Sequence, residues 1–191
     1  MKNLQYRSAI TIFVGITILS FIIYIFLISN ISFKELISKD LNHLIKPIGL
    51  IITIDIIIWT IFDKWLWKLR IFHSWLVKIP DLNGIWIGTY ETKYKTSKIR
   101  LEIIQTLTII GCKIETENGV SVGYATNILY EPEKHQKKLI ISYNYELQSN
   151  KENKEHRGTY DLIIDEQNKL LKGSYWTNKP SKGKISALKK L

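Results

Sequence analysis

The chain has 191 residues, of which 27 are Lys or Arg and 17 are Asp or Glu, so its formal net charge is +10. A single cysteine, Cys112, excludes an intramolecular disulfide. The positive charge is spread along the whole chain, which argues against a DNA or RNA partner. It favours an anionic ligand or anionic lipid headgroups instead.

Two apolar runs dominate the first 79 residues. The first covers about 8–29 without a charge or a proline, longer than the ~20 residues that a helix needs to cross a bilayer. The second covers about 44–63. Together they predict a two-helix transmembrane hairpin within residues 1–79. Tryptophans cluster with basic residues at 64–79, which predicts a juxtamembrane amphipathic segment at the headgroup layer.

Asp55 lies near the middle of the second run. A carboxylate at mid-bilayer costs ~2.5–3.5 kcal/mol on insertion scales and usually faces protein or water. One interpretation is a contact between helices of an oligomer. The other is a protonated carboxyl that bonds to Thr11, Thr17 or Tyr24 within the hairpin.

Basic residues flank the predicted spans on the outer sides of the hairpin. They precede the first span and follow the second, at Lys2, Arg7, Lys64, Lys68 and Arg70. Because positive charge is enriched on the cytoplasmic side of membranes, both termini and the domain that follows the second span are expected to be cytoplasmic.

From residue 83 the apolar pattern changes to a period of two, which is typical of strands. Turn residues bound eight such segments, at 84–94, 98–110, 112–117, 120–130, 138–147, 157–165, 170–178 and 183–189. Short connections and the need to cover strand edges favour an eight-stranded antiparallel up-and-down β-barrel over a sandwich. We therefore expect residues 80–191 to form an all-β ligand-binding domain.

Alternation along these segments separates two kinds of inward-facing residue. Aliphatic residues, Ile109 among them, fill one end of the strands. Aromatic and polar residues converge at the other end: Gln105, Tyr143, Tyr145, His156, Tyr160 and Tyr175. A barrel of eight strands has room for one small ligand, and aromatic rings suit nucleobases. The alternative is that these phenols bond to one another and to water.

Arg157, Lys179 and Lys182 lie near strand ends, where they are candidates to meet phosphates. The alternative is that they are ordinary solvated charges at the rim of the barrel. The sequence contains no Gly-rich phosphate loop, no nucleophile–base arrangement and no metal-ligand spacing. We therefore expect a binding protein rather than an enzyme, with no metal site.

Five short motifs follow one another along the predicted barrel. They are G-x-W-x-G at 84–88, Q-T at 105–106, Y-N-Y at 143–145, H-R-G-T at 156–159 and G-S-Y-W-T at 173–177. The first alone resembles lipocalin-like folds. The full order, after two apolar runs, resembles the membrane-tethered β-barrel effectors of bacterial CBASS anti-phage systems.

The resemblance implies that the barrel binds a cyclic dinucleotide made by a CD-NTase-type nucleotidyltransferase after phage infection. Binding would drive homo-oligomerisation, and the clustered spans would disrupt the bacterial inner membrane, leading to cell death or growth arrest. The protein would then be a multi-pass inner-membrane protein whose activating ligand takes the place of a cofactor. The residues in matching motifs are Gln105, Tyr143, Tyr145, His156 and Tyr175.

Two other functions are compatible with the sequence. One is a membrane-anchored barrel that binds a lipid or another small hydrophobic ligand. The other is a structural membrane protein without a ligand.

Overall fold

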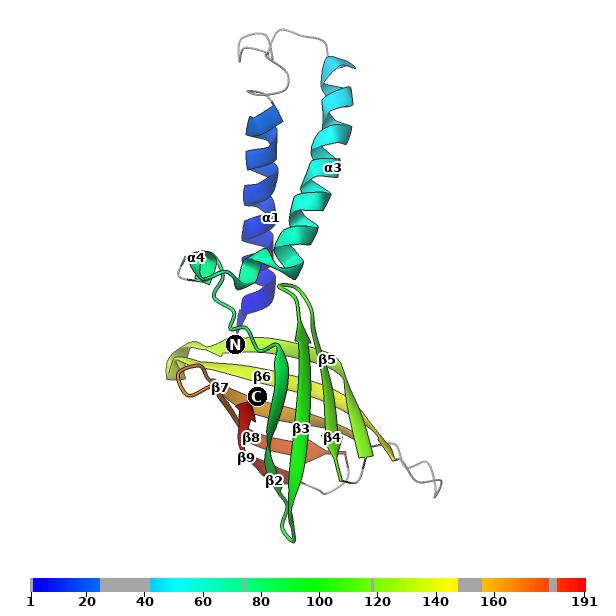
Figure 1. Cartoon of the computed structure of the whole chain (residues 1–191), viewed down its shortest axis with the longest axis vertical. Coiled ribbons are helices and arrows are strands. Elements are labelled where there is room, and N and C mark those ends of the chain that lie inside the picture. Colours follow the sequence, from blue (N-terminus) through cyan, green and yellow to red (C-terminus); the bar gives the residue numbers. More distant parts are fainter. Residues whose placement is uncertain (1, 25–41, 74, 118, 148–155, 179–181) are drawn as a thin grey trace. The chain divides into compact units, whose positions relative to one another are not determined.

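The computed structural model describes residues 2–24, 42–73, 75–117, 119–147, 156–178 and 182–191 (Figure 1). The chain divides into two compact units. One holds Tyr6–Lys78, and the other holds Ile79–Leu191 together with the first five residues.

Helices make up the first unit. They are α1 (Leu4–Ile23), α3 (Asn42–Lys64), the 3-10 turn η2 (Leu66–Lys68) and the single turn α4 (Arg70–His73). The ring of Phe13 on α1 packs edge-to-face against Trp59 on α3, with centroids 5.5 Å apart. Among the α3 residues whose burial is described, Ile51, Asp55 and Phe62 are buried, and their spacings of four and seven residues place them on one face.

No helix in the described part of the chain is long and apolar enough to span a membrane. The prediction of a transmembrane hairpin is therefore wrong, and so is the multi-pass inner-membrane location with cytoplasmic termini. The uncharged part of α1 runs only from Ser8 to Ile23, and residues 25–29 of the predicted span lie outside the described residues. In α3, Lys46, Asp55 and Asp63 leave no uncharged run near the ~20 residues that a span requires.

The segment after α3 consists of two short helical pieces. Leu69 has an extended backbone (φ −69°, ψ 134°), which separates η2 from α4. The aromatic residues of this segment fold back on the end of α3. The rings of Phe62 and Phe72 lie 5.2 Å apart, and Trp67 is fully buried.

The second unit is the predicted eight-stranded antiparallel β-barrel (Figure 1). Each strand pairs with its neighbours in the chain, and the pairing of the first with the last closes the barrel. The strands are β2 (Gly84–Glu91), β3 (Thr96–Gln105), β4 (Ile110–Thr116), β5 (Gly119–Glu131), β6 (Gln136–Leu147), β7 (His156–Asp165), β8 (Leu170–Thr177) and β9 (Lys182–Lys190).

Two short elements complete this unit. The two-residue strand β1 (Lys2–Asn3) pairs with Leu129 and Tyr130 of β5. The 3-10 turn η3 (Pro132–Lys134) joins β5 to β6. We call the end of the barrel at which η3 lies the Gln105 end, because Gln105 is the last residue of β3. The opposite side, where β8 finishes, is the Tyr175 end.

The barrel interior changes character between these two ends. Toward the Gln105 end it is filled by fully buried aliphatic side chains: Leu101, Ile103, Leu107, Ile128, Leu139, Leu162, Leu171 and Leu188. Toward the Tyr175 end the buried residues include polar and phenolic ones, Ser97, Ser121, Tyr143, Tyr160 and Tyr175, beside aliphatic ones such as Ile99 and Ile185. The buried phenols therefore lie together at one end, as alternation predicts, whereas the aliphatic residues are not confined to the other end.

The segment predicted as one strand over 98–110 contains a turn. The backbone N–H of Thr106 donates to the carbonyl of Ile109 (2.9 Å), and the Thr106 hydroxyl accepts from the backbone N–H of Ile109 (3.1 Å). The turn changes the alternation, so Ile109 is 68% exposed rather than inward-facing. Threonine bonds its own turn in this way because its hydroxyl competes with the strand ladder for backbone groups.

Cys112 faces the barrel interior, where burial raises the pKa of its thiol from 9.0 to about 12, although a bond with Thr126 acts in the opposite direction. The folded state therefore keeps this proton while the unfolded chain loses it near pH 9. Stability linked to Cys112 is present below pH 9 and is lost as the pH rises toward 12. We expect the free energy of unfolding in urea to fall above pH 9, with Cys112 contributing up to about 1.4 kcal/mol per pH unit.

Cys112→Ala tests this assignment, because alanine does not titrate. The variant is expected to lose less stability than the wild type between pH 9 and 11, although Tyr160, whose pKa burial also raises, still contributes. Identical pH dependence of the two proteins would show that the thiol is not the group concerned.

Candidate functional site

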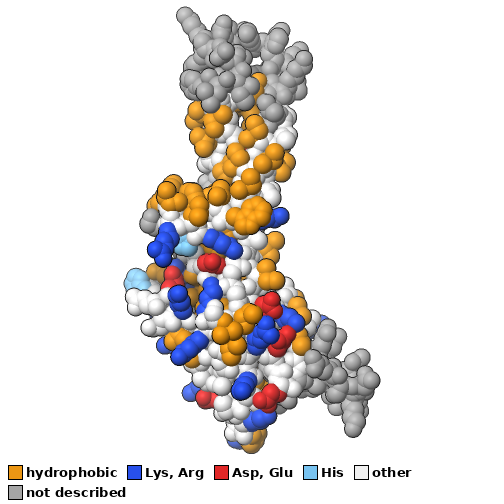
Figure 2. Space-filling view, in the orientation of Figure 1, with side chains coloured by type: hydrophobic (Ala, Val, Ile, Leu, Met, Phe, Trp, Pro, Cys, Tyr) orange, Lys and Arg blue, Asp and Glu red, His pale blue; other side chains and the backbone are white. Residues whose placement is uncertain are grey.

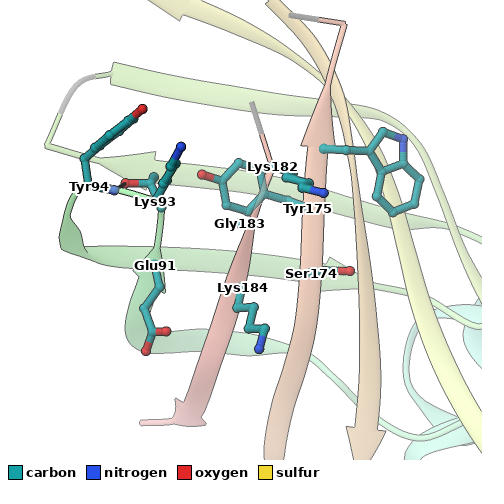
Figure 3. A pocket seen from close by; sticks show the side chains of 10 residues that line it. Glu91, Lys93, Tyr94, Ser174, Tyr175, Lys182, Gly183 and Lys184 are labelled. Atoms are coloured by element: carbon teal, nitrogen blue, oxygen red, sulfur yellow. Dashed lines mark hydrogen bonds between the residues drawn. The ribbon is translucent and has the colours of Figure 1, made fainter. Parts of the chain in front are cut away.

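A pocket of about 910 Å³ opens at the Tyr175 end of the barrel (Figure 3). Small-molecule sites in proteins typically enclose ~300–1,000 Å³. The end of β2 and the turn that follows it form one side, and the adjoining parts of β8 and β9 form the other. Its lining residues are Glu91, Thr92, Lys93, Tyr94, Ser174, Tyr175, Trp176, Lys182, Gly183 and Lys184.

Gly183 allows the ring of Tyr175 to enter this pocket. The two residues are cross-strand partners on β8 and β9. A Cβ atom at position 183 would lie 2.5 Å from the Tyr175 ring and 2.8 Å from its hydroxyl oxygen, so a larger residue would displace the ring. In Figure 3 the hydroxyl end of Tyr175 points toward Lys93 and Tyr94.

A row of tyrosine rings leads from the pocket into the barrel. Tyr175 lies 6.0 Å from Tyr90 and 5.6 Å from Tyr160, and Tyr160 lies 4.8 Å from Tyr143, all between ring centroids. Burial, and then the neighbouring phenols, raises the pKa of Tyr160 well above its ordinary value and also raises the pKa of Tyr175. Both phenols therefore keep their protons at neutral pH, and the Tyr175 hydroxyl remains a hydrogen-bond donor.

Positive charge exceeds negative charge in the pocket lining. Lys93, Lys182 and Lys184 are set against one acid, Glu91, which leaves an excess of two positive charges. The Glu91 carboxylate accepts a hydrogen bond from the Ser186 hydroxyl (3.0 Å). Figure 3 shows that Glu91 and Lys184 extend together, away from Tyr94. The Lys93 and Tyr94 side of the pocket is therefore the side suited to an anion.

The predicted site residues of β6, β7 and β8 lie at the Tyr175 end. Tyr175 lines the pocket, whereas Tyr143 is buried deeper, stacked on Tyr160. Tyr145 and His156 are cross-strand partners near the ends of β6 and β7, and their side chains lie outside the described residues. Arg157 is exposed, and its backbone N–H donates to the Asn178 side chain (3.2 Å).

Gln105 lies at the opposite end of the barrel from this pocket. Its side-chain oxygen accepts from the backbone N–H of Leu82 (2.8 Å), and its side-chain nitrogen donates to the carbonyl of Pro80 (3.1 Å). Asn83 completes the arrangement by bonding to the Gln105 backbone through both side-chain atoms. These bonds attach the segment that precedes β2 to the end of β3.

Gln105→Leu is expected to destabilise the barrel without changing ligand binding at the Tyr175 end. The change leaves the Leu82 N–H and the Pro80 carbonyl buried without their partner, at a cost of ~1–3 kcal/mol for each group. We expect a loss of about 2–4 kcal/mol in urea unfolding, with the binding constant measured at a temperature where the variant is folded. A variant that keeps its stability and loses its binding would place Gln105 in the ligand site.

Asp55 is 6% exposed on α3, and no hydrogen-bond partner of its Oδ1 atom is present among the described residues. The hydroxyl of Ser20 on α1 is buried and without a partner in the same way. Thr17, one of the partners considered for Asp55, donates its hydroxyl to the Phe13 carbonyl (3.1 Å). A carboxyl buried without a partner is costly, so Asp55 is a candidate for a contact made in another state of the protein.

Sequence reasoning missed the part of the pocket formed by the β2–β3 turn. The first strand was predicted to continue to 94, which hid the turn and its residues Lys93 and Tyr94. A Thr-Lys-Tyr-Lys sequence between two strands is a signal for such a turn, because threonine hydroxyls bond to nearby backbone groups. Lys182 is one of the predicted phosphate contacts and lines the pocket, whereas Lys179 lies outside the described residues.

A closed barrel with an aromatic and cationic pocket at one end defines a class of protein: a small-ligand receptor barrel suited to a flat anion. The family model described as Cap15, cyclic dinucleotide receptor domain, matches residues 77–189. Because this match covers more than half of the chain, the chain belongs to the Cap15 cyclic dinucleotide receptor family. Comparison with curated proteins gives no match.

Membership of this family supports cyclic nucleotide binding, within a CBASS effector, as the role of the barrel. It also favours a binding domain over a catalytic one, because a receptor acts through the complex that it forms.

Proposed function

We propose that the barrel binds a cyclic dinucleotide in the pocket at the Tyr175 end and that binding promotes self-association of the chain. The observation that carries this proposal is the combination of lysines and aromatic rings around one cavity. A cyclic dinucleotide has two phosphodiesters, each with one negative charge. The excess of two positive charges in the pocket lining matches that ligand.

The pocket residues have distinct parts in this proposal. Lys93 and Lys182 contact the phosphates as point charges, and the protonated Tyr175 hydroxyl donates a hydrogen bond to the same ligand. The rings of Tyr94 and Trp176 offer faces on which bases stack. Tyr143 and Tyr160 support Tyr175 from inside the barrel, through the ring contacts described above.

The packing of the interior supports a polar ligand over the lipid alternative. An acyl chain requires an apolar cavity, but the aliphatic half of the barrel is occupied by its own side chains. Leu107, Ile128, Leu139 and Leu171 are each 0% exposed. The pocket described above lies at the end where the lining is phenolic and charged.

Self-association is proposed to use the helical unit. Hydrophobic side chains cover much of the described surface of α1 and α3 (Figure 2). Ile18 and Ile56 illustrate this exposure, at 56% and 60%. Ligand shifts the equilibrium toward the assembly only if the assembled form binds it more tightly. Asp55, which is buried without a partner for Oδ1, is the group that we expect to gain one on assembly.

A titration of the full chain tests the proposal. Cyclic dinucleotides with different bases are added to the purified protein, and binding is followed by calorimetry and oligomeric state by light scattering. We expect micromolar or tighter binding of at least one ligand, together with an increase in mass. A linear dinucleotide serves as the control for charge alone. Absence of binding by every cyclic dinucleotide would refute the proposal.

A further inference from the structure

Tyr94 occupies an unusual place for a large aromatic side chain. It lies at the tip of the β2–β3 turn and lines the pocket, yet it is 87% exposed. Burying an aromatic ring stabilises a protein by ~1.5–3 kcal/mol, and a ring left exposed at the edge of a pocket does not make this contribution. The ring is therefore available to a ligand.

The turn that carries Tyr94 is held by a dense set of hydrogen bonds. The Thr92 hydroxyl accepts from the backbone N–H of Lys95 (3.0 Å) and of Tyr94 (3.3 Å), and it donates to the Lys95 carbonyl (2.9 Å). The backbone N–H of Thr92 donates to the same carbonyl (2.9 Å). Because the backbone is fixed, only the two side-chain torsions of Tyr94 remain to be ordered by a ligand.

An ion pair links the tip of this turn to the next hairpin. The Lys95 ammonium lies 2.7 Å from the Glu117 carboxylate. Both groups are exposed, so the pair adds little to stability, but it favours one position of the turn relative to β4. The turn and the neighbouring hairpin together hold the backbone of Tyr94 in one position.

Lys93 defines the side of the ring that remains available. Its ammonium nitrogen lies 5.5 Å from the centroid of the Tyr94 ring, over one face. The opposite face is the one on which a base can stack. A base on that face and a phosphate at Lys93 then lie on opposite sides of the Tyr94 ring.

We propose that Tyr94 determines base specificity by stacking on one base of the bound cyclic dinucleotide and selecting a purine there. The inference rests on the proposed function and deepens it. A ring face presents no hydrogen-bonding edge, so discrimination comes from stacking area, which is larger for the two fused rings of a purine. Stacking of a base on an aromatic side chain is worth ~1–3 kcal/mol.

The test compares Tyr94→Leu with the wild-type full chain. Binding constants are measured by calorimetry for cyclic di-AMP, cyclic AMP-UMP and cyclic di-UMP. We expect the variant to bind the purine-containing ligands at least ~5-fold more weakly and to lose most of the preference for purine over pyrimidine. Tyr94→Phe is expected to restore both quantities, because the stacking face is retained.

Tyr124→Leu is the matched control. Tyr124 is an exposed tyrosine on β5 that does not line the pocket, so its replacement is expected to change neither affinity nor base preference. Thr92→Val, which keeps the ring but loosens the turn, is expected to reduce the purine preference in part.

The outcomes separate the inference from the function on which it rests. A wild-type chain that binds none of the three ligands, or any other cyclic dinucleotide, overturns both. A wild-type chain that binds, with a Tyr94→Leu variant of unchanged purine preference, overturns the inference alone. An equal loss of affinity for all three ligands also overturns the inference alone, because it would mean that Tyr94 stacks on purines and pyrimidines equally well.

Discussion

Replacement of the two lysines that we propose contact the phosphates, Lys93→Ala with Lys182→Ala, is expected to weaken cyclic dinucleotide binding by at least ~100-fold. A hydrogen bond to a charged group contributes ~1.5–3 kcal/mol, and the double variant removes two such groups from the pocket. It also cancels the excess of two positive charges that the pocket lining carries. The measurement is the binding constant of the full chain by calorimetry at two salt concentrations.

Lys172→Ala with Lys189→Ala is the matched control for that experiment. These lysines are exposed on β8 and β9 but do not line the pocket, so the pair removes the same net charge elsewhere on the same strands. We expect less than a 3-fold change, from screened long-range attraction alone. Equal losses in both double variants would mean that general charge, rather than this pocket, attracts the ligand.

Gly88→Ala is expected to destabilise the barrel strongly. A Cβ atom at this position would collide with the carbonyl oxygen of Ala187 and lie 2.8 Å from its carbonyl carbon. The clash falls where the β2–β9 register shifts, at the pairing that closes the barrel. Because backbone rather than a flexible side chain must move, we expect a loss of about 3 kcal/mol in urea unfolding.

Gly111→Ala provides the comparison, since it also places a methyl group on a barrel strand. The nearest atom to its Cβ would be the Ile104 carbonyl oxygen at 3.8 Å, an ordinary contact. A stability change within ~1 kcal/mol of the wild type is expected, with a small gain from the stiffer unfolded chain. If both variants unfolded at the same urea concentration, close packing at position 88 would not limit the closure of the barrel.

The barrel was predictable because the pattern that identifies each strand lies within that strand's own sequence. Alternating residues such as Leu139, Ile141 and Tyr143 commit a strand to one face, and a closed sheet needs nothing further to fix its order. The error at 106–109 has a local cause as well. The alternating pattern predicts that Thr106 and Thr108 are outward-facing residues of a strand. In the structure the Thr106 hydroxyl instead accepts hydrogen bonds from the backbone N–H groups of Thr108 and Ile109 and so closes a turn.

The helical unit was harder to interpret, because hydropathy alone does not set the length of a helix. Two apolar runs indicated spans, but the charges within α3 and the polar start of α1 decide how much uncharged helix exists. Burial of Asp55 shows the same difficulty. A sequence identifies the carboxyl as unusual, while only the packed helices show that its Oδ1 atom is buried without a partner in the described residues.

The candidate site was predictable in part. Tyr175 and Lys182 belong to strands whose alternation and ends can be read from sequence, and both line the pocket. Tyr94 cannot be found that way, because its role depends on a turn that meets β8 and β9 in space. Gln105 shows the converse. Alternation places its side chain inside the barrel, but that side chain bonds the backbone of Pro80 and Leu82 and so holds the segment before β2 against the end of β3.

The aliphatic half of the barrel has a consequence for timing in the cell. Its packing is complete without any bound molecule, since residues such as Leu139 and Leu171 are already fully buried. The barrel is therefore expected to fold before it meets a ligand. Under the function proposed above, the receptor is present in advance, and the response time is set by how fast the ligand accumulates rather than by new synthesis of the receptor.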